Sequence, residues 1–277
     1  MHIIADSSST RTQWVMAKGS TIMMQATTAG INPYFHTRRE ISHIIRLGLP
    51  EDFFRRRWDN VFFYGSGCAN EQKNKIVEQC LVAQFKTPCT VNSNLLGAAR
   101  GLLVRRSGLA CILGTGSNSC YYDGENITRT VRPLGFVLGD EGSKAYLGKA
   151  LVANVLKELA PQHICEAFYK KFNVSTDQIM DSIYTESLPS LTLAEYSSLL
   201  ADLIDDPYVH RLVYDAFMAF FTRNISRYDY CNKPISFVGS AAVAYSDILH
   251  EAANDFGASI RDIRPDSMPG LVEFHAT

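Results

Sequence analysis

The chain has 277 residues, of which 46% are hydrophobic and 20% are charged, and its formal net charge is -1 at pH 7. This balance is typical of a globular protein, and it gives no electrostatic reason to expect a nucleic-acid partner or an acidic membrane surface. No segment reaches the roughly 18 consecutive apolar residues that a membrane-spanning helix requires.

In chain order, the hydrophobic pattern of the first part predicts three strands followed by alternating helices and strands. The expected strands are 2–5, 13–18, 21–27, 60–64 and 89–91, and the expected helices are 36–48, 71–85 and 94–105. A boundary is expected at Arg105-Arg106-Ser107-Gly108, where a new apolar run begins.

The second part opens with strands again and then becomes helical. It is expected to contain a hairpin at 109–122, a strand near 126–132, helices over 143–230, a strand at 235–238, a helix at 241–256 and a short apolar segment at 271–274. Because a similar element order occurs twice, we expect two related α/β domains, 1–106 and 107–277, with a ligand in the cleft between them.

A polar turn separates the first two expected strands. Asp6 ends the first strand, and Ser7-Ser8-Ser9-Thr10 follow it. A carboxylate at the end of a strand suits Mg²⁺, which keeps most of its waters and takes one or two carboxylates. Backbone N–H and hydroxyl groups in the turn suit phosphate oxygens. The alternative is a solvated hairpin in which Asp6 closes an Asx turn.

A second turn of this kind, Gly114-Thr115-Gly116-Ser117, divides the apolar run that opens the second part. Glycines let the backbone approach a ligand closely, although the same residues also form ordinary hairpins. The presence of one such turn near the start of each part favours a shared phosphate-binding role.

The seven cysteines are odd in number, form no Cys-x-x-Cys pair and mostly have apolar neighbours. We therefore expect buried, reduced thiols in a cytoplasmic protein, and the N-terminal residues lead into a strand rather than a signal peptide. The seven histidines show no metal-ligand spacing, so no structural zinc or iron–sulfur site is expected.

Taken together, the motifs resemble the N-acetylglucosamine kinase branch of the actin/Hsp70/sugar-kinase superfamily, near the activator-ATPase-like proteins of bacteria. The resemblance covers nearly the whole chain, at 6–12, 30–35, 63–68, 94–100, 113–119, 134–143 and 237–241. It implies an α/β fold of two ribonuclease H-like domains with an interdomain cleft. It also implies ATP- and Mg²⁺-dependent phosphorylation of N-acetylglucosamine or a related amino sugar at the exocyclic 6-hydroxyl.

The resemblance also implies roles for individual residues. Asp6 would organise Mg²⁺ as a catalytic residue. ATP would be bound by Ser7, Ser8, Ser9, Thr10 and Arg11 on one side and by Thr115, Gly116, Ser117, Gly239, Ser240 and Ala241 on the other. The sugar would be bound by Asn32, Asn94, Gly135 and Asp140. The alternatives are a turn at Asn32 before Pro33, and capping of the helix from Ser143 by Asp140 and Glu141.

Two positions depart from the family pattern. Ser8 and Ser9 fill a phosphate turn that is richer in glycine in the family, which also has a lysine near Arg11. Asn94 stands where the family has the aspartate that faces the sugar hydroxyl as a base, and no Asp or Glu occurs between Glu78 and Asp123.

An amide orients a hydroxyl but does not accept its proton at neutral pH. The sequence therefore predicts a slow kinase or, alternatively, a sugar- and nucleotide-binding sensor without turnover. An activator ATPase with an iron–sulfur cluster at a dimer interface is a third possibility, which the scattered cysteines disfavour. The apolar helices of the second domain are compatible with a homodimer and equally with core packing.

Overall fold

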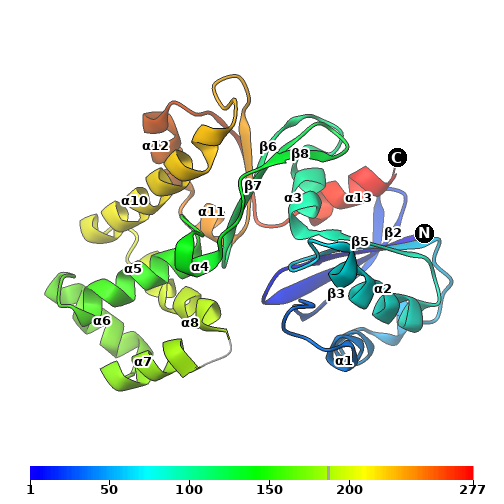
Figure 1. Cartoon of the computed structure of the whole chain (residues 1–277), viewed down its shortest axis with the longest axis horizontal. Coiled ribbons are helices and arrows are strands. Elements are labelled where there is room, and N and C mark those ends of the chain that lie inside the picture. The colour runs from blue at the N-terminus through cyan, green and yellow to red at the C-terminus, as the bar shows by residue number, and fades with distance from the viewer. Residues whose placement is uncertain (186–187, 277) are drawn as a thin grey trace. The chain divides into compact units, whose positions relative to one another are not determined.

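The computed structural model describes residues 1–185 and 188–276, and the chain divides into two compact units (Figure 1). Unit 1 contains Met1–Ser107, Tyr122–Thr128 and Asp266–Thr277, and unit 2 contains Gly108–Tyr121 and Arg129–Pro265. The division differs from the expected boundary mainly at the C-terminal end, which belongs to unit 1. The reason is that Met268, Leu271 and Val272 are buried against apolar residues of the first sheet.

Unit 1 is built on a five-stranded sheet. Its strands are β1 (His2–Ser7), β2 (Arg11–Lys18), β3 (Thr21–Ala29), β4 (Asn60–Gly65) and β5 (Cys89–Ser93), in the order β3-β2-β1-β4-β5. Strand β2 is antiparallel to both of its neighbours, whereas β4 is parallel to β1 and β5. The sheet is therefore mixed.

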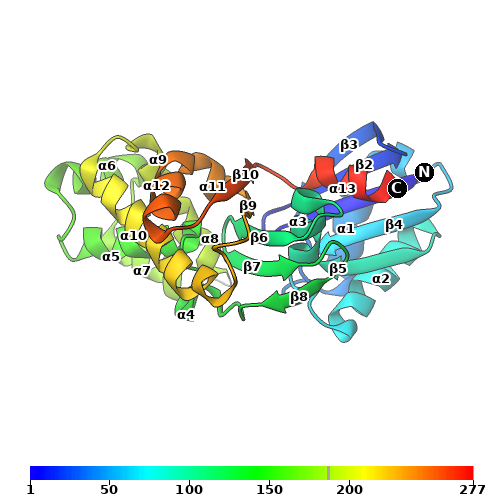
Figure 2. The ribbon, with the colours of Figure 1, turned by 90° about the horizontal axis from the view of Figure 1, so that it is seen from above.

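Helices cover both faces of this sheet because successive residues of a strand point to opposite faces. Ile3 and Ala5 of β1 belong to the core under α1 and α2, whereas Ile4 lies in the core under the C-terminal helix. The helices of unit 1 are α1 (Arg38–Gly48), α2 (Glu71–Phe85), α3 (Asn94–Leu103) and α13 (Met268–Ala276), with a 3-10 turn, η1 (Glu51–Phe53). Helix α13, red in Figure 2, packs on α3 and β1.

The second sheet, which lies mainly in unit 2, repeats the same strand order. Its strands are β6 (Gly108–Leu113), β7 (Ser117–Tyr122), β8 (Ile127–Thr130), β9 (Ile235–Val238) and β10 (Ile260–Arg264), in the order β10-β9-β6-β7-β8. In both units the first strand lies at the centre, with the second and third on one side and the fourth and fifth on the other. The predicted α/β fold with two ribonuclease H-like units is confirmed.

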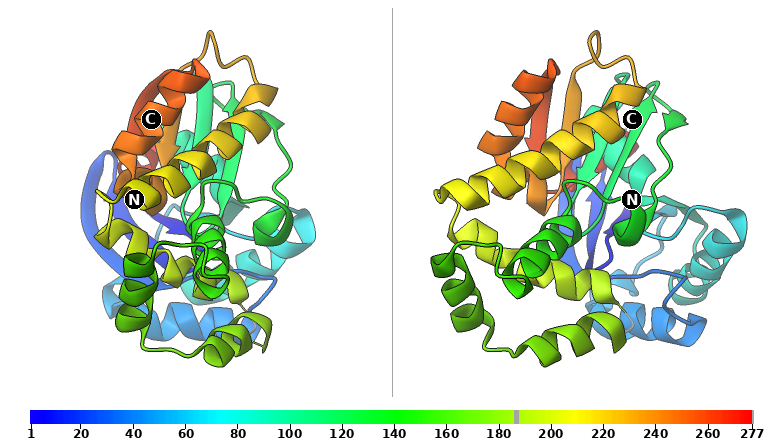
Figure 3. Two further views of the ribbon diagram at one scale, coloured as in Figure 1. Left: turned by 90° about the vertical axis from the view of Figure 1, so that its left-hand side faces the viewer. Right: turned by 60° about the vertical axis from the view of Figure 1, so that its left-hand side comes forward.

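The helical region of unit 2 lies between β8 and β9 in the chain and is coloured green to yellow in Figure 3. It contains α4 (Gly135–Leu138), α5 (Lys144–Leu156), α6 (Gln162–Phe172), α7 (Thr176–Thr185), α8 (Pro189–Tyr196), α9 (Ser198–Asp202), α10 (Pro207–Arg223) and a 3-10 turn, η2 (Ile225–Arg227). Positions 186–187 of the expected helical region lie outside the described residues. No helix within the described ranges is long and apolar enough to cross a membrane.

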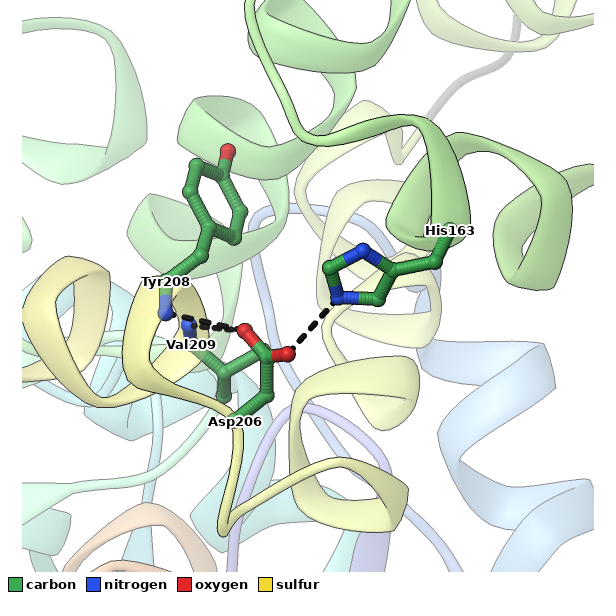
Figure 4. Close-up of polar contacts among 4 residues, drawn as sticks. All are labelled: His163, Asp206, Tyr208 and Val209. Carbon is green, nitrogen blue, oxygen red and sulfur yellow. Dashed lines mark hydrogen bonds and ion pairs between the residues drawn. The ribbon is translucent and has the colours of Figure 1, made fainter.

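Helix α10 is fixed at its first turn by Asp206 (Figure 4). The Asp206 carboxylate accepts the backbone N–H groups of Tyr208 at 2.8 Å and Val209 at 3.4 Å, and it pairs with Nε2 of His163 on α6 at 2.7 Å. The contact with His163, followed by the two N–H groups, lowers the pKa of Asp206. This one side chain therefore caps α10 and ties it to α6.

Two parts of the C-terminal region differ from the sequence-based prediction. The helix expected at 241–256 is divided at Tyr245 into α11 (Ser240–Ala244) and α12 (Ser246–Phe256). Strand β10 was not predicted, because Arg261, Asp262 and Arg264 interrupt its apolar pattern.

Candidate functional site

The carboxyl ends of three parallel strands meet at one edge of the unit 1 sheet. In the register of the sheet, Ser7 of β1 lies opposite Gly65 of β4, which lies opposite Ser93 of β5. Asp6 is the residue before Ser7, and Asn94 is the residue after Ser93. The fold therefore brings both predicted catalytic residues to the edge where ligands bind in open α/β sheets.

The Asp6 carboxylate has one hydrogen-bond partner among the residues that the structure describes. The hydroxyl of Ser267, just before α13, donates to its Oδ2 at 2.9 Å. Burial raises the pKa of Asp6 to about 6, partly opposed by this hydrogen bond. The carboxylate does not close the Asx turn that was considered as an alternative. Within the described ranges, no group of three or more metal-ligating side chains occurs.

The turn after Asp6 is held by its own serines. The buried Ser7 hydroxyl accepts the N–H of Ile31 at 2.9 Å and contacts the hydroxyl of Thr12 at 2.8 Å. The Ser8 hydroxyl accepts the N–H groups of Thr10 at 3.3 Å and Arg11 at 3.2 Å. The side chain of Ser7 is therefore unavailable to a ligand, and Ser8 is engaged within the turn. The Ser9, Thr10 and Arg11 side chains are exposed.

Asn32 lies next to this turn because Gly30 permits close packing. A Cβ at Gly30 would lie 2.6 Å from the carbonyl oxygen of Ser8. Oδ1 of Asn32 accepts the N–H of Tyr34 at 3.0 Å, so the turn given above as the alternative interpretation of Asn32 does form. The Asn32 side-chain NH₂ group has no partner among the described residues, which leaves it free to donate to a ligand.

Asn94 is the first residue of α3, and Ser93 caps the helix by accepting the N–H of Leu96 at 3.3 Å. The Asn94 side chain is half-buried and has no hydrogen-bond partner within the part of the chain that the structure describes. An unpartnered amide at this edge of the sheet is suited to orient a hydroxyl group.

In unit 2, the turn between β6 and β7 is braced by the start of α5. The N–H groups of Lys144 and Ala145 donate to the carbonyl oxygens of Gly114 at 2.8 Å and Thr115 at 3.1 Å. These donors would otherwise be unsatisfied at the helix N-terminus. A Cβ at Gly114 would meet no atom within 4 Å, so no contact within the chain requires glycine there.

Asp140 lies against the same turn. Its Oδ1 accepts the N–H of Ser117 at 3.3 Å, and a Cβ at Gly116 would lie 3.1 Å from its Oδ2. Burial is the main cause that raises the pKa of Asp140. The fold therefore joins a residue predicted to bind sugar to residues predicted to bind phosphate.

The alternative in which Asp140 and Glu141 cap the helix is wrong, because Ser143 caps α5 by accepting the N–H of Tyr146 at 3.2 Å. Glu141 instead pairs with Arg223 at 2.9 Å and is only 7% exposed. Gly135, also predicted to bind sugar, begins α4 with a φ of 71°.

The turn after β9 completes this edge of unit 2. Val238 lies beside Ile112 in the parallel pairing of β9 with β6. Gly239 follows with a φ of 125°, and a Cβ there would lie 2.3 Å from the carbonyl oxygen of Leu113. Gly239 and the exposed Ser240 therefore adjoin the Gly114 turn, whereas Ala241 is buried.

Sequence reasoning missed a pocket of about 350 Å³ in unit 2. Its lining includes Ser117 and Asp140 together with three arginines, Arg132, Arg223 and Arg227. Arg132 comes from the loop after β8, whereas Arg223 at the end of α10 and Arg227 in η2 follow much later in the chain. No local motif could have indicated that they line one pocket.

Solved structures with this fold include sugar kinases. The chain is similar, at 36% identity and a TM-score of 0.95, to a protein of Porphyromonas gingivalis assigned as an N-acetylglucosamine kinase, with coverage of 100% of this chain and 99% of that chain. A protein of Chromobacterium violaceum with the same assignment has 17% identity and a TM-score of 0.80, with coverage of 99% and 98%. A ROK family glucokinase from Streptomyces griseus, solved with glucose and AMPPNP, has 13% identity and a TM-score of 0.62, with coverage of 99% and 97%. No protein-family model and no curated protein matches the chain.

The paired ribonuclease H-like units, each with a polar turn after its first strand, and the 36% identical relative place the chain in the actin/Hsp70/sugar-kinase superfamily. Identity of 36% over the full length is more specific than a shared fold. The chain belongs to the N-acetylglucosamine kinase-like family of this superfamily.

Proposed function

We propose that this protein is an ATP-dependent kinase that phosphorylates N-acetylglucosamine, or a closely related amino sugar, at the exocyclic 6-hydroxyl. The observation that carries the proposal is the hydrogen bond from the Ser117 N–H to Asp140. It couples a candidate sugar-binding carboxylate to a candidate phosphate-binding turn. A kinase requires this proximity, because phosphoryl transfer depends mainly on positioning and charge stabilisation.

The Gly114 turn is the candidate phosphate-binding element of unit 2. The open space where a Cβ of Gly114 would lie gives a phosphate access to the backbone. Thr115, Gly116 and Ser117 would then bind phosphate oxygens, and Gly239 and Ser240 would lie against the adenosine. In unit 1, the turn from Ser8 to Arg11 would bind phosphate through its exposed side chains and remaining N–H groups.

The surroundings of Asp6 fit a bound Mg²⁺ ion. The carboxylate is partly buried, and among the described residues it has no paired cation and accepts only from the Ser267 hydroxyl. A partly buried, unpaired carboxylate with one oxygen free of protein donors is a suitable ligand for a hydrated divalent cation. When bound, Mg²⁺ would neutralise charge on the phosphate oxygens.

Asn94 and Asn32 would orient the sugar, and neither accepts a proton from its hydroxyl. General-base assistance typically contributes about 10²–10⁴-fold to a rate, so we expect slow turnover. The alternative is a sugar- and nucleotide-binding sensor without turnover, which the unpartnered amide of Asn94 favours because it retains hydroxyl recognition.

The test measures ATP-dependent phosphorylation of N-acetylglucosamine by the unmodified chain and by Asn94→Asp, with sugar binding followed by calorimetry. Asn70→Asp is the matched control, because Asn70 caps α2 and aspartate caps equally well. Slow turnover by the unmodified chain that becomes faster in Asn94→Asp but not in Asn70→Asp supports the kinase proposal. If the unmodified chain binds the sugar but only Asn94→Asp turns it over, the sensor alternative is supported. Absence of phosphorylation by every variant overturns the kinase proposal.

A further inference from the structure

The pocket of unit 2 has an excess of positive charge. Its lining contains three arginines, Arg132, Arg223 and Arg227, and two acidic residues, Asp140 and Glu141, so its formal net charge is +1. An arginine guanidinium is charged at all physiological pH values and presents several N–H donors in a planar fork.

Both acids have partners within unit 2. The nearly buried carboxylate of Glu141 accepts from Arg223 at 2.9 Å and from Nδ2 of Asn224 at 3.3 Å. Asp140 accepts the N–H of Ser117 at 3.3 Å. The pairing of Glu141 with Arg223 leaves Arg132 and Arg227 as the cations that no acid neutralises among the described residues.

The remaining lining is suited to a sugar-sized molecule. Asn118 and Thr222 provide amide and hydroxyl groups, and Pro133, Leu134 and Leu138 provide apolar surface. The volume of about 350 Å³ lies within the range of small-molecule sites. Such a pocket would accept a ligand that combines hydroxyl groups, an apolar face and a negative charge.

We infer that the pocket binds a sugar-sized ligand carrying an oxyanion, a carboxylate or a phosphate, with Arg132 and Arg227 as its charge-recognising residues. The inference rests on the proposed function in so far as this ligand is the phosphoryl acceptor. Planar arginine forks bind either oxyanion through paired hydrogen bonds. The neutral N-acetylglucosamine is then a poorer ligand than an acidic derivative.

The test compares binding of N-acetylglucosamine, N-acetylmuramic acid, N-acetylglucosamine 6-phosphate and inorganic phosphate by calorimetry at low and high salt. N-acetylmuramic acid differs from N-acetylglucosamine by one carboxylate-bearing substituent. N-acetylglucosamine 6-phosphate and inorganic phosphate test recognition of a phosphate group. The variants are Arg132→Gln and Arg227→Gln. Arg129→Gln is the matched control, because Arg129 is exposed on the neighbouring β8 and outside the pocket lining.

We expect an acidic probe to bind at least about 10-fold more tightly than N-acetylglucosamine, since hydrogen bonds to charged groups are strong. This preference should fall about 10-fold in Arg132→Gln or Arg227→Gln, remain in Arg129→Gln and weaken with salt. Preference for the carboxylate probe identifies a sugar acid, and preference for the phosphate probes identifies a phosphorylated ligand.

Equal binding of neutral and acidic probes, or a preference that both pocket variants retain, overturns the inference. Phosphorylation of N-acetylglucosamine without any preference for an oxyanion also overturns it and leaves the proposed function standing. If the preference for an oxyanion depends on the arginines but no phosphoryl transfer occurs, the inferred role of the pocket is supported and the proposed kinase activity is overturned. The two failures are therefore distinguishable.

Discussion

The hydroxyl of Ser267 donates a hydrogen bond of 2.9 Å to Oδ2 of Asp6, although the two residues are 261 positions apart in the chain. Ser267 is fixed just before α13, whose Gly270 packs so closely on α3 that a Cβ there would lie 1.7 Å from the carbonyl oxygen of Gly101. Helix α3 begins with Asn94. The C-terminal segment therefore both contacts Asp6 and packs on the helix that begins with Asn94.

Replacement of Ser267 by alanine should destabilise unit 1. The partly buried Asp6 carboxylate would lose its hydrogen-bond donor, and loss of such a bond to a charged group costs about 1–3 kcal/mol. Urea unfolding at pH 7.5 measures the change. Ser246→Ala is the control, because Ser246 makes a longer, exposed bond of 3.5 Å to Asp247. Equal unfolding free energies for the two variants would contradict the structural importance of the Asp6 contact.

Two neighbouring glycines should respond differently to alanine. A Cβ at Gly116 would lie 3.1 Å from Oδ2 of Asp140, whereas one at Gly114 meets no atom within 4 Å. We expect Gly116→Ala to lower the free energy of unfolding by about 1 kcal/mol and Gly114→Ala to change it by less than about 0.5 kcal/mol.

The Gly114→Ala and Gly116→Ala variants also distinguish an effect on folding from an effect on ligand binding. A methyl group at Gly114 would fill the space through which we propose that phosphate approaches, so the affinity for AMPPNP should fall about 10-fold in Gly114→Ala, as expected for one lost charge-assisted hydrogen bond. Calorimetry at saturating Mg²⁺ measures this affinity. Unchanged AMPPNP binding by a folded Gly114→Ala variant would remove this turn from the proposed phosphate site.

His275 should make the stability of unit 1 depend on pH. Burial, followed by the charge of Arg100, lowers the pKa of His275 to about 3 from 6.5. Its Nε2 lies 2.8 Å from the hydroxyl of Tyr64, which itself accepts from Arg100 at 3.0 Å. Protonation of the ring would place a second donor against that hydroxyl group.

Because the folded pKa lies below the unfolded value, the contribution of His275 is complete above about pH 6.5 and is lost as the pH falls toward 3. The loss should approach about 1.4 kcal/mol per pH unit within this window. Urea unfolding of the unmodified chain and of His275→Gln between pH 7.5 and 4.5 tests this, with His210→Gln as an exposed control. A difference between the unmodified chain and His275→Gln that does not change with pH would refute it.

Asp206 should stabilise unit 2 mainly as a helix cap. Asp206→Ala removes the acceptor for two N–H groups and should cost about 1 kcal/mol, as expected for loss of an N-cap. Asp206→Asn retains a capping oxygen and should lose less. Thermal or urea unfolding of both variants measures the difference, and equal losses would instead assign the stabilisation to the charge that faces His163.

The sequence predicted those parts of the site that depend on neighbouring residues. The turn after Asp6 and the glycine turn at Gly114 were both predicted as strand–turn–strand segments, because polar small residues divide apolar runs there. The sequence did not predict β10, because the charged residues of this edge strand interrupt its apolar pattern. It also did not predict the break at Tyr245 between α11 and α12. The roles of the individual site residues stay predictions until binding is measured.

By itself, the sequence determined the repeated order of strands and helices and the chemistry available in each turn, because hydrophobic period and turn residues act over a few neighbouring positions. Only the tertiary structure decided that Ser267 meets Asp6, that Asp140 meets Ser117, and that Arg132 and Arg227 line one pocket. Such pairs form when the packing of buried side chains brings distant segments together, and no local pattern carries that information.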